Sequence, residues 1–303
     1  MSLSELLRVG GARVLEHVAL GSRTTYRVGG SARVLVTMTS STDLEELGAL
    51  LFSCDFPIVV LGNGSNLLVA DGEHDIIGVY LTGAFASLQW RDERGAVAVD
   101  AGAGLDLPIA ARRLAAEGIV GFEWAVGVPG TFGGAVVMNA GGHGSDMAAS
   151  VVSVDTFTAS GVRTWTPDDL EFGYRSSALD GSQIVTSVQL RLAHGDAKEA
   201  LAQIKEIVHW RREHQPGGAN AGSVFRNPEG DHAGRLIELA GCKGLRVGSA
   251  VVSEKHANFI IVGADGSAND VYRLLTTVRE RVREATGITL VSEHRFVGFE
   301  GAS

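Results

Sequence analysis

The chain has 303 residues, which is enough for roughly two domains with a substantial buried core. Its residues are 45% hydrophobic and 20% charged, a composition that indicates a folded globular protein and excludes a disordered one. The formal net charge of −9 argues against a general nucleic-acid-binding protein, because such a chain is repelled by the phosphate backbone. An anionic small ligand stays open, since backbone N–H groups and a few cations can override the overall charge locally.

The cysteines and the apolar pattern favour a cytoplasmic protein. Cys54 and Cys242 are far apart and match neither a metal-ligand spacing nor a disulfide scaffold. Residues 1–21 place Glu5 and Arg8 among apolar residues, so we expect no signal peptide. No apolar run reaches the length of about 18 residues that a membrane helix needs. We therefore expect a cytoplasmic, soluble chain that binds no membrane, no nucleic acid and no metal.

The first 80 residues predict a small strand–helix–strand unit. A helix is expected over 41–54, because Thr42 and Glu45 have the spacing of a capping box and leucines recur at helical intervals. Strands are expected at 26–38 (two short strands around Gly29-Gly30), at 56–61 and at 66–70.

In the rest of the chain, the predicted secondary structure changes near residue 195 from mainly strands to mainly helices. Residues 79–192 are rich in strand patterns, with one clear helix at 106–118 that Gly118 closes. Beyond Asp196, helices dominate, at 196–214, 231–241 and 267–287, with a strand at 258–264. Strands first and helices later predict an α+β fold, not a doubly wound parallel sheet.

Three loops concentrate residues that suit ligand binding: 62–66, the glycine-rich stretch 125–144, and 221–228. The first reads either as a hairpin turn, since Asn-Gly favours one, or as a nest of N–H groups for a pyrophosphate. It is not a Rossmann fingerprint, because a strand follows where a helix should begin, and it lacks the lysine of a phosphate-binding Walker loop. The second reads either as a crossing of two strands or as backbone that approaches a large flat ligand.

Eight motifs, in order along nearly the whole chain, resemble the UDP-N-acetylenolpyruvoylglucosamine reductase (MurB) family. They are TTYRVGG (24–30), LGNGSNLLVAD (61–71), GVPGTFGGAVVMNAG (127–141), FGYRSS (172–177), AGSVFRNP (221–228), AGCKG (240–244), SEKHANFI (253–260) and SEHRFVG (292–298). The short stretch after Tyr174 is typical of the compact type, which lacks an inserted tyrosine-bearing loop.

The resemblance implies a vanillyl-alcohol-oxidase-type (PCMH-like) FAD-binding fold, which uses no Rossmann motif. It implies three parts, namely FAD-binding subdomain 1 (1–78), FAD-binding subdomain 2 (79–195) and a smaller α+β substrate-binding domain (196–303). The loop 62–66 would hold the FAD pyrophosphate and the loop 127–135 would lie along the isoalloxazine. The cofactor-binding residues implied are Gly62, Asn63, Gly64, Ser65, Asn66, Gly127, Val128, Pro129, Gly130, Gly133, Gly134 and Ala135.

The implied reaction is the reduction of UDP-N-acetylglucosamine enolpyruvate to UDP-N-acetylmuramate, with NADPH as co-substrate. Ser223 matches the family's proton donor, while Arg175 and Glu293 match its other catalytic positions. Without the resemblance, Ser223 reads as a turn or capping hydroxyl, and Arg175 and Glu293 as an exposed ion pair. Tyr174, Asn227, Lys243 and His256 would bind substrate, although Lys243 reads equally well as a surface lysine.

Three positions depart from the family pattern. His214 and Arg226 replace lysines, and His294 follows Glu293 where a valine is usual. A histidine is mostly neutral near pH 7, so the change at 214 would weaken contact with a phosphate. Two other functions stay open: a different flavin oxidoreductase on the same scaffold, and a non-catalytic nucleotide-sugar binder. We expect a monomer whose only partner is the nucleotide-sugar substrate.

Overall fold

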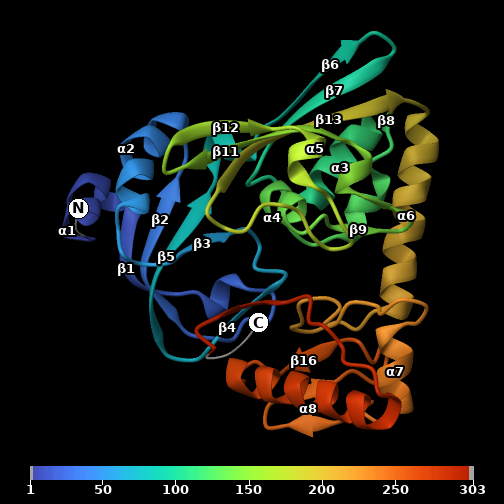
Figure 1. The fold of residues 1–303 in the computed structure, drawn as a ribbon. Coiled ribbons are helices and arrows are strands. Elements are labelled where there is room, and N and C mark those ends of the chain that lie inside the picture. The colour runs from blue at the N-terminus through green and yellow to red at the C-terminus, as the bar shows by residue number, and fades with distance from the viewer. Residues whose placement is uncertain (1–2, 300–303) are drawn as a thin grey trace. The chain divides into compact units, whose positions relative to one another are not determined.

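The computed structural model describes residues 3–299 and divides them into two compact units (Figure 1). The first unit comprises residues 3–16, Arg33–Asn63 and Asp75–Trp210. The second comprises His17–Ala32, Gly64–His74 and residues 211–299. Each unit is therefore assembled from separate stretches of chain. The three-part organisation expected from the sequence stays a prediction, and its outermost residues, 1–2 and 300–303, lie outside the described chain.

Two sheets make up the framework of the first unit. One has the strand order β1-β2-β5-β3, with β3 and β5 parallel, and the larger has the order β12-β11-β13-β7-β6, with β8 added beside β13. The strands are β1 Val14–Ala19, β2 Ser31–Met38, β3 Ile58–Leu61, β5 Glu73–Leu81, β6 Leu88–Glu93, β7 Ala96–Gly102, β8 Ile119–Val120, β11 Val151–Thr158, β12 Gly161–Trp165 and β13 Ile184–His194, and β9 Gly141–Gly142 pairs with β10 Ser145–Asp146.

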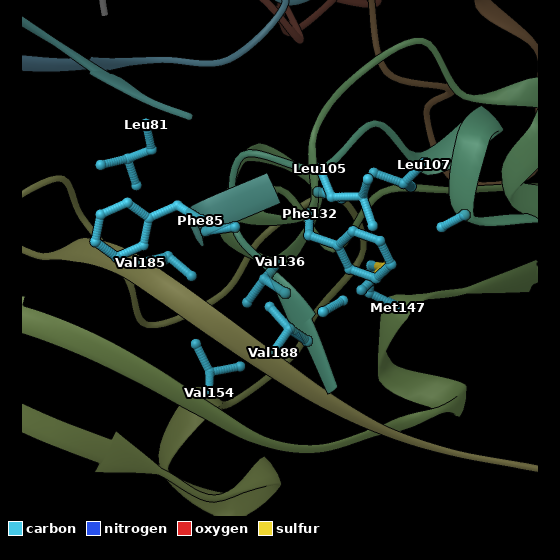
Figure 2. Close-up of a cluster of buried hydrophobic side chains, with 14 of the residues drawn as sticks. Leu81, Phe85, Leu105, Leu107, Phe132, Val136, Met147, Val154, Val185 and Val188 are labelled. Atoms are coloured by element: carbon cyan, nitrogen blue, oxygen red, sulfur yellow. The ribbon is translucent and has the colours of Figure 1, made fainter. Parts of the chain in front are cut away.

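Helices pack against these sheets through small residues and apolar faces. Helix α2 approaches β11 so closely that a Cβ at Gly48 would lie 2.3 Å from Phe157. Phe132 and Val136 of α4 point into the core that the larger sheet also lines (Figure 2). The helices are α1 Leu3–Gly10, α2 Ser41–Phe52, α3 Leu107–Ala116, α4 Phe132–Val137, α5 Pro167–Leu170 and α6 Ala197–His214, whose last residues belong to the second unit. Short 3-10 turns lie at Gly11–Arg13, Gly83–Ala86, Glu123–Gly127 and Met147–Ala149, and one more, Gly21–Arg23, lies in the second unit.

The second unit has its own core, formed around helix α8. The antiparallel sheet β14-β15-β16 packs on α8, and β17 runs parallel to β4 with Arg295 opposite Leu67. Tyr26 and Leu68, from the early part of the chain, are fully buried in this core. The elements are α7 Ala233–Leu239, α8 Ala268–Thr286, β4 Leu67–Val69, β14 Arg246–Val247, β15 Ala250–Val252, β16 Ile260–Val262 and β17 Arg295–Val297.

Local sequence predicted several elements correctly and two details wrongly. Helix α3 ends at Ala116, with Glu117 as its C-cap and Gly118 at φ +71° after it, as the C-terminal glycine predicts. The capping box of α2, however, uses Ser40 and Asp43, not Thr42 and Glu45. Residues 26–28 form no strand, because Arg27 has φ +60° and interrupts an extended backbone.

Candidate active site

The loop that begins at Gly62 contacts the residues that precede helices α3 and α4. The side-chain amide of Asn63 donates to Oδ1 of Asp106 at 2.6 Å. Gly62 lies against Thr131, since a Cβ at Gly62 would be only 2.4 Å from the Thr131 Oγ1. The predicted hairpin alternative is wrong, because β3 pairs with β5 while β4 pairs with β17. Gly62 is therefore a close-approach glycine, and the loop is not a turn between paired strands.

The 125–144 stretch forms a 3-10 turn followed by helix α4, so the predicted crossing of two strands is also wrong. Its backbone is tied to the segment that leads into α3: Leu107 donates to the Gly130 carbonyl at 2.9 Å, and Phe132 donates to the Leu105 carbonyl at 3.0 Å. The other predicted cofactor residues of this stretch differ in their surroundings. Gly127 lies against His143, and the Val128 N–H donates to the Ala125 carbonyl. Pro129 is exposed and Ala135 is buried.

One face of this stretch offers unsatisfied backbone donors. Within the first unit, no described residue accepts a hydrogen bond from the backbone N–H of Gly130, Thr131 or Gly134. Gly134 is exposed, and a Cβ there would meet nothing closer than 3.9 Å, whereas a Cβ at Gly133 would be 3.2 Å from Ala103. Free N–H groups beside an uncovered glycine suit a large anionic, planar group such as FAD.

The continuation of the first loop belongs to the second unit and also carries open donors. Within that unit, no described residue accepts from the backbone N–H of Gly64, Ser65 or Asn66. Gly64 has φ +58°, and a Cβ there would lie 2.6 Å from the Thr24 Cα, so only glycine fits. Three successive N–H groups without protein acceptors fit a pyrophosphate. In the Asn66 side chain, in contrast, both polar atoms have partners within the second unit.

Arg175 belongs to the first unit and sits in a strained turn. Its φ is +56°, its guanidinium donates to the Gly141 carbonyl at 2.8 Å, and its Cζ lies 5.4 Å from the Tyr174 ring centroid. Tyr174 itself is 57% exposed and so presents its ring to solvent. The buried Asn139 donates to the Gly173 carbonyl at 2.9 Å and thereby fixes the turn. Left-handed backbone at a non-glycine residue is costly, so its retention at Arg175 is consistent with a functional position.

The structure brings Ser223 and Glu293 onto adjacent segments of the second unit. The backbone N–H of Glu293 donates to the carbonyl of Val224, the residue after Ser223, at 2.9 Å. An isolated bridge joins Phe225 to Ser292, and the Asn258 side chain clamps both backbone groups of Phe225. Both Ser223 and Glu293 are half-buried. Their backbones therefore cannot move independently.

The predicted substrate-binding residues of the second unit have defined partners. Asn227 accepts a hydrogen bond from the Ala233 N–H at 3.0 Å, before helix α7, which gives it a structural contact as well. Lys243 pairs with Glu238 at 3.0 Å and is largely exposed.

His256 is half-buried and packs edge-on against Phe259 with ring centroids 4.8 Å apart. Burial lowers the pKa of His256 from its usual value. Nearby Glu238 raises that pKa and Lys243 lowers it, which places His256 within reach of the Lys243–Glu238 pair.

His294 is the departure for which the structure gives a clear role. Its ring is buried, its Nε2 lies 2.9 Å from the Tyr26 hydroxyl, and its Nδ1 lies 3.2 Å from Oδ1 of Asn66. Burial lowers the pKa of His294 to about 4 and raises that of Tyr26 above its usual range. Both groups are therefore neutral near pH 7.

Sequence reasoning missed several residues that shape these loops. Each of them contacts a segment distant in sequence. Asn139 and Asn258 bond to backbone carbonyls, Asp106 and Tyr26 bond to the side chains of Asn63 and His294, and Thr131 packs against Gly62. The only local signal was that each lies within or beside a glycine-rich stretch or a quoted motif.

Comparison with known proteins agrees with this geometry. A family model described as an FAD binding domain matches residues 32–166, and one for the C-terminal domain of UDP-N-acetylenolpyruvoylglucosamine reductase matches residues 214–297. The enzyme of that name from Synechococcus sp. (strain WH7803) is 42% identical over 94% of this chain and 93% of its own length. A second, from Symbiobacterium thermophilum, is 39% identical over 98% of this chain and 96% of its own.

Solved structures give the same fold. The crystal structure of UDP-N-acetylenolpyruvylglucosamine reductase from Thermus caldophilus superposes with a TM-score of 0.79 at 38% identity, covering 92% of this chain and 97% of that one. A variant of the BBE-like 1 protein of Physcomitrella patens shares the fold at 14% identity and a TM-score of 0.57, covering 95% and 90% of the two chains. The predicted α+β fold, with a vanillyl-alcohol-oxidase-type FAD-binding domain and a distinct C-terminal domain, is confirmed.

Proposed function

Because this chain belongs to the UDP-N-acetylenolpyruvoylglucosamine reductase family, we propose that Arg175, Ser223 and Glu293 catalyse its reduction of UDP-N-acetylglucosamine enolpyruvate to UDP-N-acetylmuramate. It is a flavin-dependent UDP-N-acetylmuramate dehydrogenase of peptidoglycan synthesis, with FAD as cofactor and NADPH as reductant. The observation that carries this assignment is the match over nearly the whole chain, which includes both the FAD-binding part and the C-terminal part.

The backbone donors described above are the groups that would hold the cofactor. In the second unit these are the N–H groups of Gly64, Ser65 and Asn66, and in the first unit those of Gly130 and Gly134. When bound, FAD takes a hydride from NADPH and supplies it to the substrate. The uncovered face of Gly134 supports contact with a flat ring, and the three successive N–H groups support contact with a pyrophosphate.

The chain's own residues have the remaining chemistry to perform. Hydride addition to the enolpyruvyl group leaves negative charge that spreads onto the substrate carboxylate. Arg175 is always charged and can bind that carboxylate through two N–H groups, so it would stabilise this charge. Ser223 would then donate the proton that the adjacent carbon requires, which is feasible for a serine only because the acceptor is strongly basic and close.

Glu293 would either carry a proton for the same step or orient the groups that take part in it. The hydrogen bond from its backbone N–H to the Val224 carbonyl supports a joint role with Ser223, since the two residues are held on adjacent segments. Tyr174, Asn227, Lys243 and His256 would contact the nucleotide sugar. The exposed ring of Tyr174 and the ammonium of Lys243 are suited to a base or sugar face and to a phosphate, respectively.

Finer assignments are also proposals. The turn in which Gly173 and Ser176 pair with each other directly follows α5, which supports the compact type without an inserted loop. We also propose a cytoplasmic location, which the two free cysteines support, and a monomer with no partner beyond the nucleotide sugar and NADPH. Among the helices of residues 3–299, none is long and apolar enough to cross a membrane.

Absorbance spectroscopy of the purified protein tests the proposal. Bands of oxidised flavin should bleach on anaerobic addition of NADPH and return on addition of the enolpyruvyl nucleotide. Bleaching without recovery would leave a flavoprotein with another substrate, as expected for a different oxidoreductase on this scaffold. A protein that neither contains FAD nor binds added FAD would contradict the roles given to the 64–66 and 130–134 backbones.

A further inference from the structure

Four residues of the second unit, Tyr26, His294, Asn66 and Glu293, form a continuous hydrogen-bond chain that is buried at Tyr26 and His294 and partly buried at Asn66 and Glu293. The Tyr26 hydroxyl lies 2.9 Å from Nε2 of His294, and Nδ1 of His294 lies 3.2 Å from Oδ1 of Asn66. The Asn66 Nδ2 in turn lies 2.8 Å from the backbone carbonyl of Glu293. Tyr26 is fully buried and His294 is 6% exposed, so water does not substitute for the contact between these two side chains.

The donors and acceptors of this chain can be assigned from one end. A backbone carbonyl only accepts, so the group that faces the Glu293 carbonyl must be the amide nitrogen of Asn66. The Asn66 oxygen then faces His294, and because that oxygen also only accepts, Nδ1 of His294 must carry a proton. A neutral imidazole has one N–H, which leaves Nε2 as an acceptor, and the Tyr26 hydroxyl must donate to it. Burial favours the neutral imidazole.

This hydrogen-bond chain helps to fix the backbone of Glu293. Its carbonyl is held by Asn66 and its N–H donates to Val224, so both of its backbone polar groups are fixed. The backbone N–H of Arg295 also donates to the Asn66 carbonyl at 2.9 Å, which secures the segment after Glu293. Because the backbone is held on both sides of Glu293, its side chain extends from a fixed point, and this limits the positions that the carboxyl group can occupy.

We propose that Tyr26 and His294 are positioning residues of this enzyme, which act through Asn66 to fix Glu293 against the segment that carries Ser223. The proposal rests on the catalytic role proposed for Glu293. It also accounts for a histidine at position 294, because a valine there would leave the Asn66 oxygen and the Tyr26 hydroxyl without these partners.

The first test measures the tautomer of His294 directly and needs no activity. Long-range ¹H–¹⁵N spectra of the native protein, with the signal identified by its loss in His294→Val, should show the proton on Nδ1 and none on Nε2. A proton on Nε2, or on both nitrogens near pH 7, would reverse the assignment and overturn the proposal.

The second test separates positioning from general structure by kinetics. Tyr26→Phe removes a single hydroxyl and should slow substrate reduction roughly three- to tenfold, with substrate affinity and the rate of flavin reduction by NADPH within about twofold of native. Tyr272→Phe is the matched control in the same unit, because Tyr272 stacks on Phe299 through its ring. Unchanged substrate reduction in folded Tyr26→Phe, or an equal fall in both half-reactions, would contradict positioning.

A double variant shows whether Tyr26 acts through Glu293. If it does, Tyr26→Phe combined with Glu293→Gln should be no slower than Glu293→Gln alone, whereas multiplied effects would overturn the proposal. Native-like activity of Glu293→Gln would instead refute the proposed role of Glu293. The tautomer measurement would still stand in that case, so the two failures are distinguishable.

Discussion

The side-chain amide of Asn63 donates to the carboxylate of Asp106 across 43 residues of sequence, with 2.6 Å between Nδ2 and Oδ1. Asp106 is the N-cap residue of α3, yet its side chain makes no capping hydrogen bond to that helix. Its carboxylate is engaged by the loop, so this pair connects the end of β3 to the beginning of α3. The position of the proposed cofactor loop therefore depends on a contact between two polar side chains.

Asn63→Asp should convert this attraction into a repulsion that depends on pH. Two carboxylates at this distance cannot both ionise freely, so the pKa of one rises. We expect a loss of about 2 kcal/mol in the free energy of unfolding above neutral pH, by urea denaturation, and part of that loss should disappear toward about pH 5 as one carboxyl binds a proton. Asn63→Ala is the control and should lose stability without this recovery; equal pH profiles for the two variants would contradict the assignment.

A pair of glycine substitutions separates packing from cofactor contact. Gly62→Ala places a Cβ 2.4 Å from the Thr131 Oγ1 and should destabilise the protein by about 1–3 kcal/mol, with partial recovery when Thr131→Ala is added. Gly134→Ala meets no protein atom closer than 3.9 Å and lies in a helix, so the stability of the FAD-free protein should stay the same or rise.

FAD affinity then tests the proposed site. Titration of the FAD-free Gly134→Ala protein should show weaker binding than native, since the added methyl group occupies the uncovered face. Native FAD affinity in this stable variant would place the flavin elsewhere.

Ser223→Ala should separate the two half-reactions. Flavin reduction by NADPH needs no proton from Ser223 and should stay within about twofold of native, while substrate reduction should fall by two or more orders of magnitude. Anaerobic stopped-flow absorbance measures each step on its own. Ser292→Ala is the neighbouring control, because its hydroxyl donates to the Val224 carbonyl at 3.3 Å. A parallel fall in both steps would leave Ser223 without a proton-donor role.

Acid should weaken the protein through His294. Its pKa is lowered to about 4 in the folded protein, so between its usual value and pH 4 the unfolded chain binds a proton that the folded chain does not. Stability is therefore fully present above about pH 6.5 and is lost as the pH falls, by about 2 kcal/mol at about pH 5.

The measurement compares urea unfolding of native protein and His294→Val at several pH values. The stability difference between them should shrink as the pH falls. His194→Val, at an exposed histidine, should track the native protein instead. A constant difference across this range would mean that His294 is not buried as a neutral ring.

Local sequence predicted a secondary-structure element correctly where interactions within that element determine it. The leucine spacing of α2 and the glycine after α3 predicted their elements correctly. The choice of capping residues was not local, because Ser40 with Asp43 and Thr42 with Glu45 both have usable spacings. Asp43 is selected by contacts from Thr39 and from the distant Arg13, whose guanidinium lowers the pKa of the Asp43 carboxyl well below its usual range.

The candidate site also contains both residues that the sequence could predict and residues whose contacts it could not predict. Ser223, Arg175 and Glu293 were proposed through family motifs, whereas nothing near Tyr26 in the sequence indicates that it contacts His294, 268 residues away. Residues 26–28 have the composition of a strand, yet they do not form one. Tyr26 is buried in the second core, and the next residue, Arg27, has a left-handed backbone that a strand does not allow. Long-range packing overrides propensity at such positions.

The parallel pairing of β4 with β17 also constrains how the protein is made. Residues 67–69 leave the ribosome more than two hundred residues before their partners at 295–297. The first unit has a separate core that is complete once residue 210 has emerged, so it can fold while synthesis continues. Tyr26, Val28 and Leu68 pack in the second core and stay without their C-terminal partners until that segment arrives. Because exposed apolar side chains favour aggregation, we expect this interval to be the stage of synthesis at which the chain is most prone to aggregate.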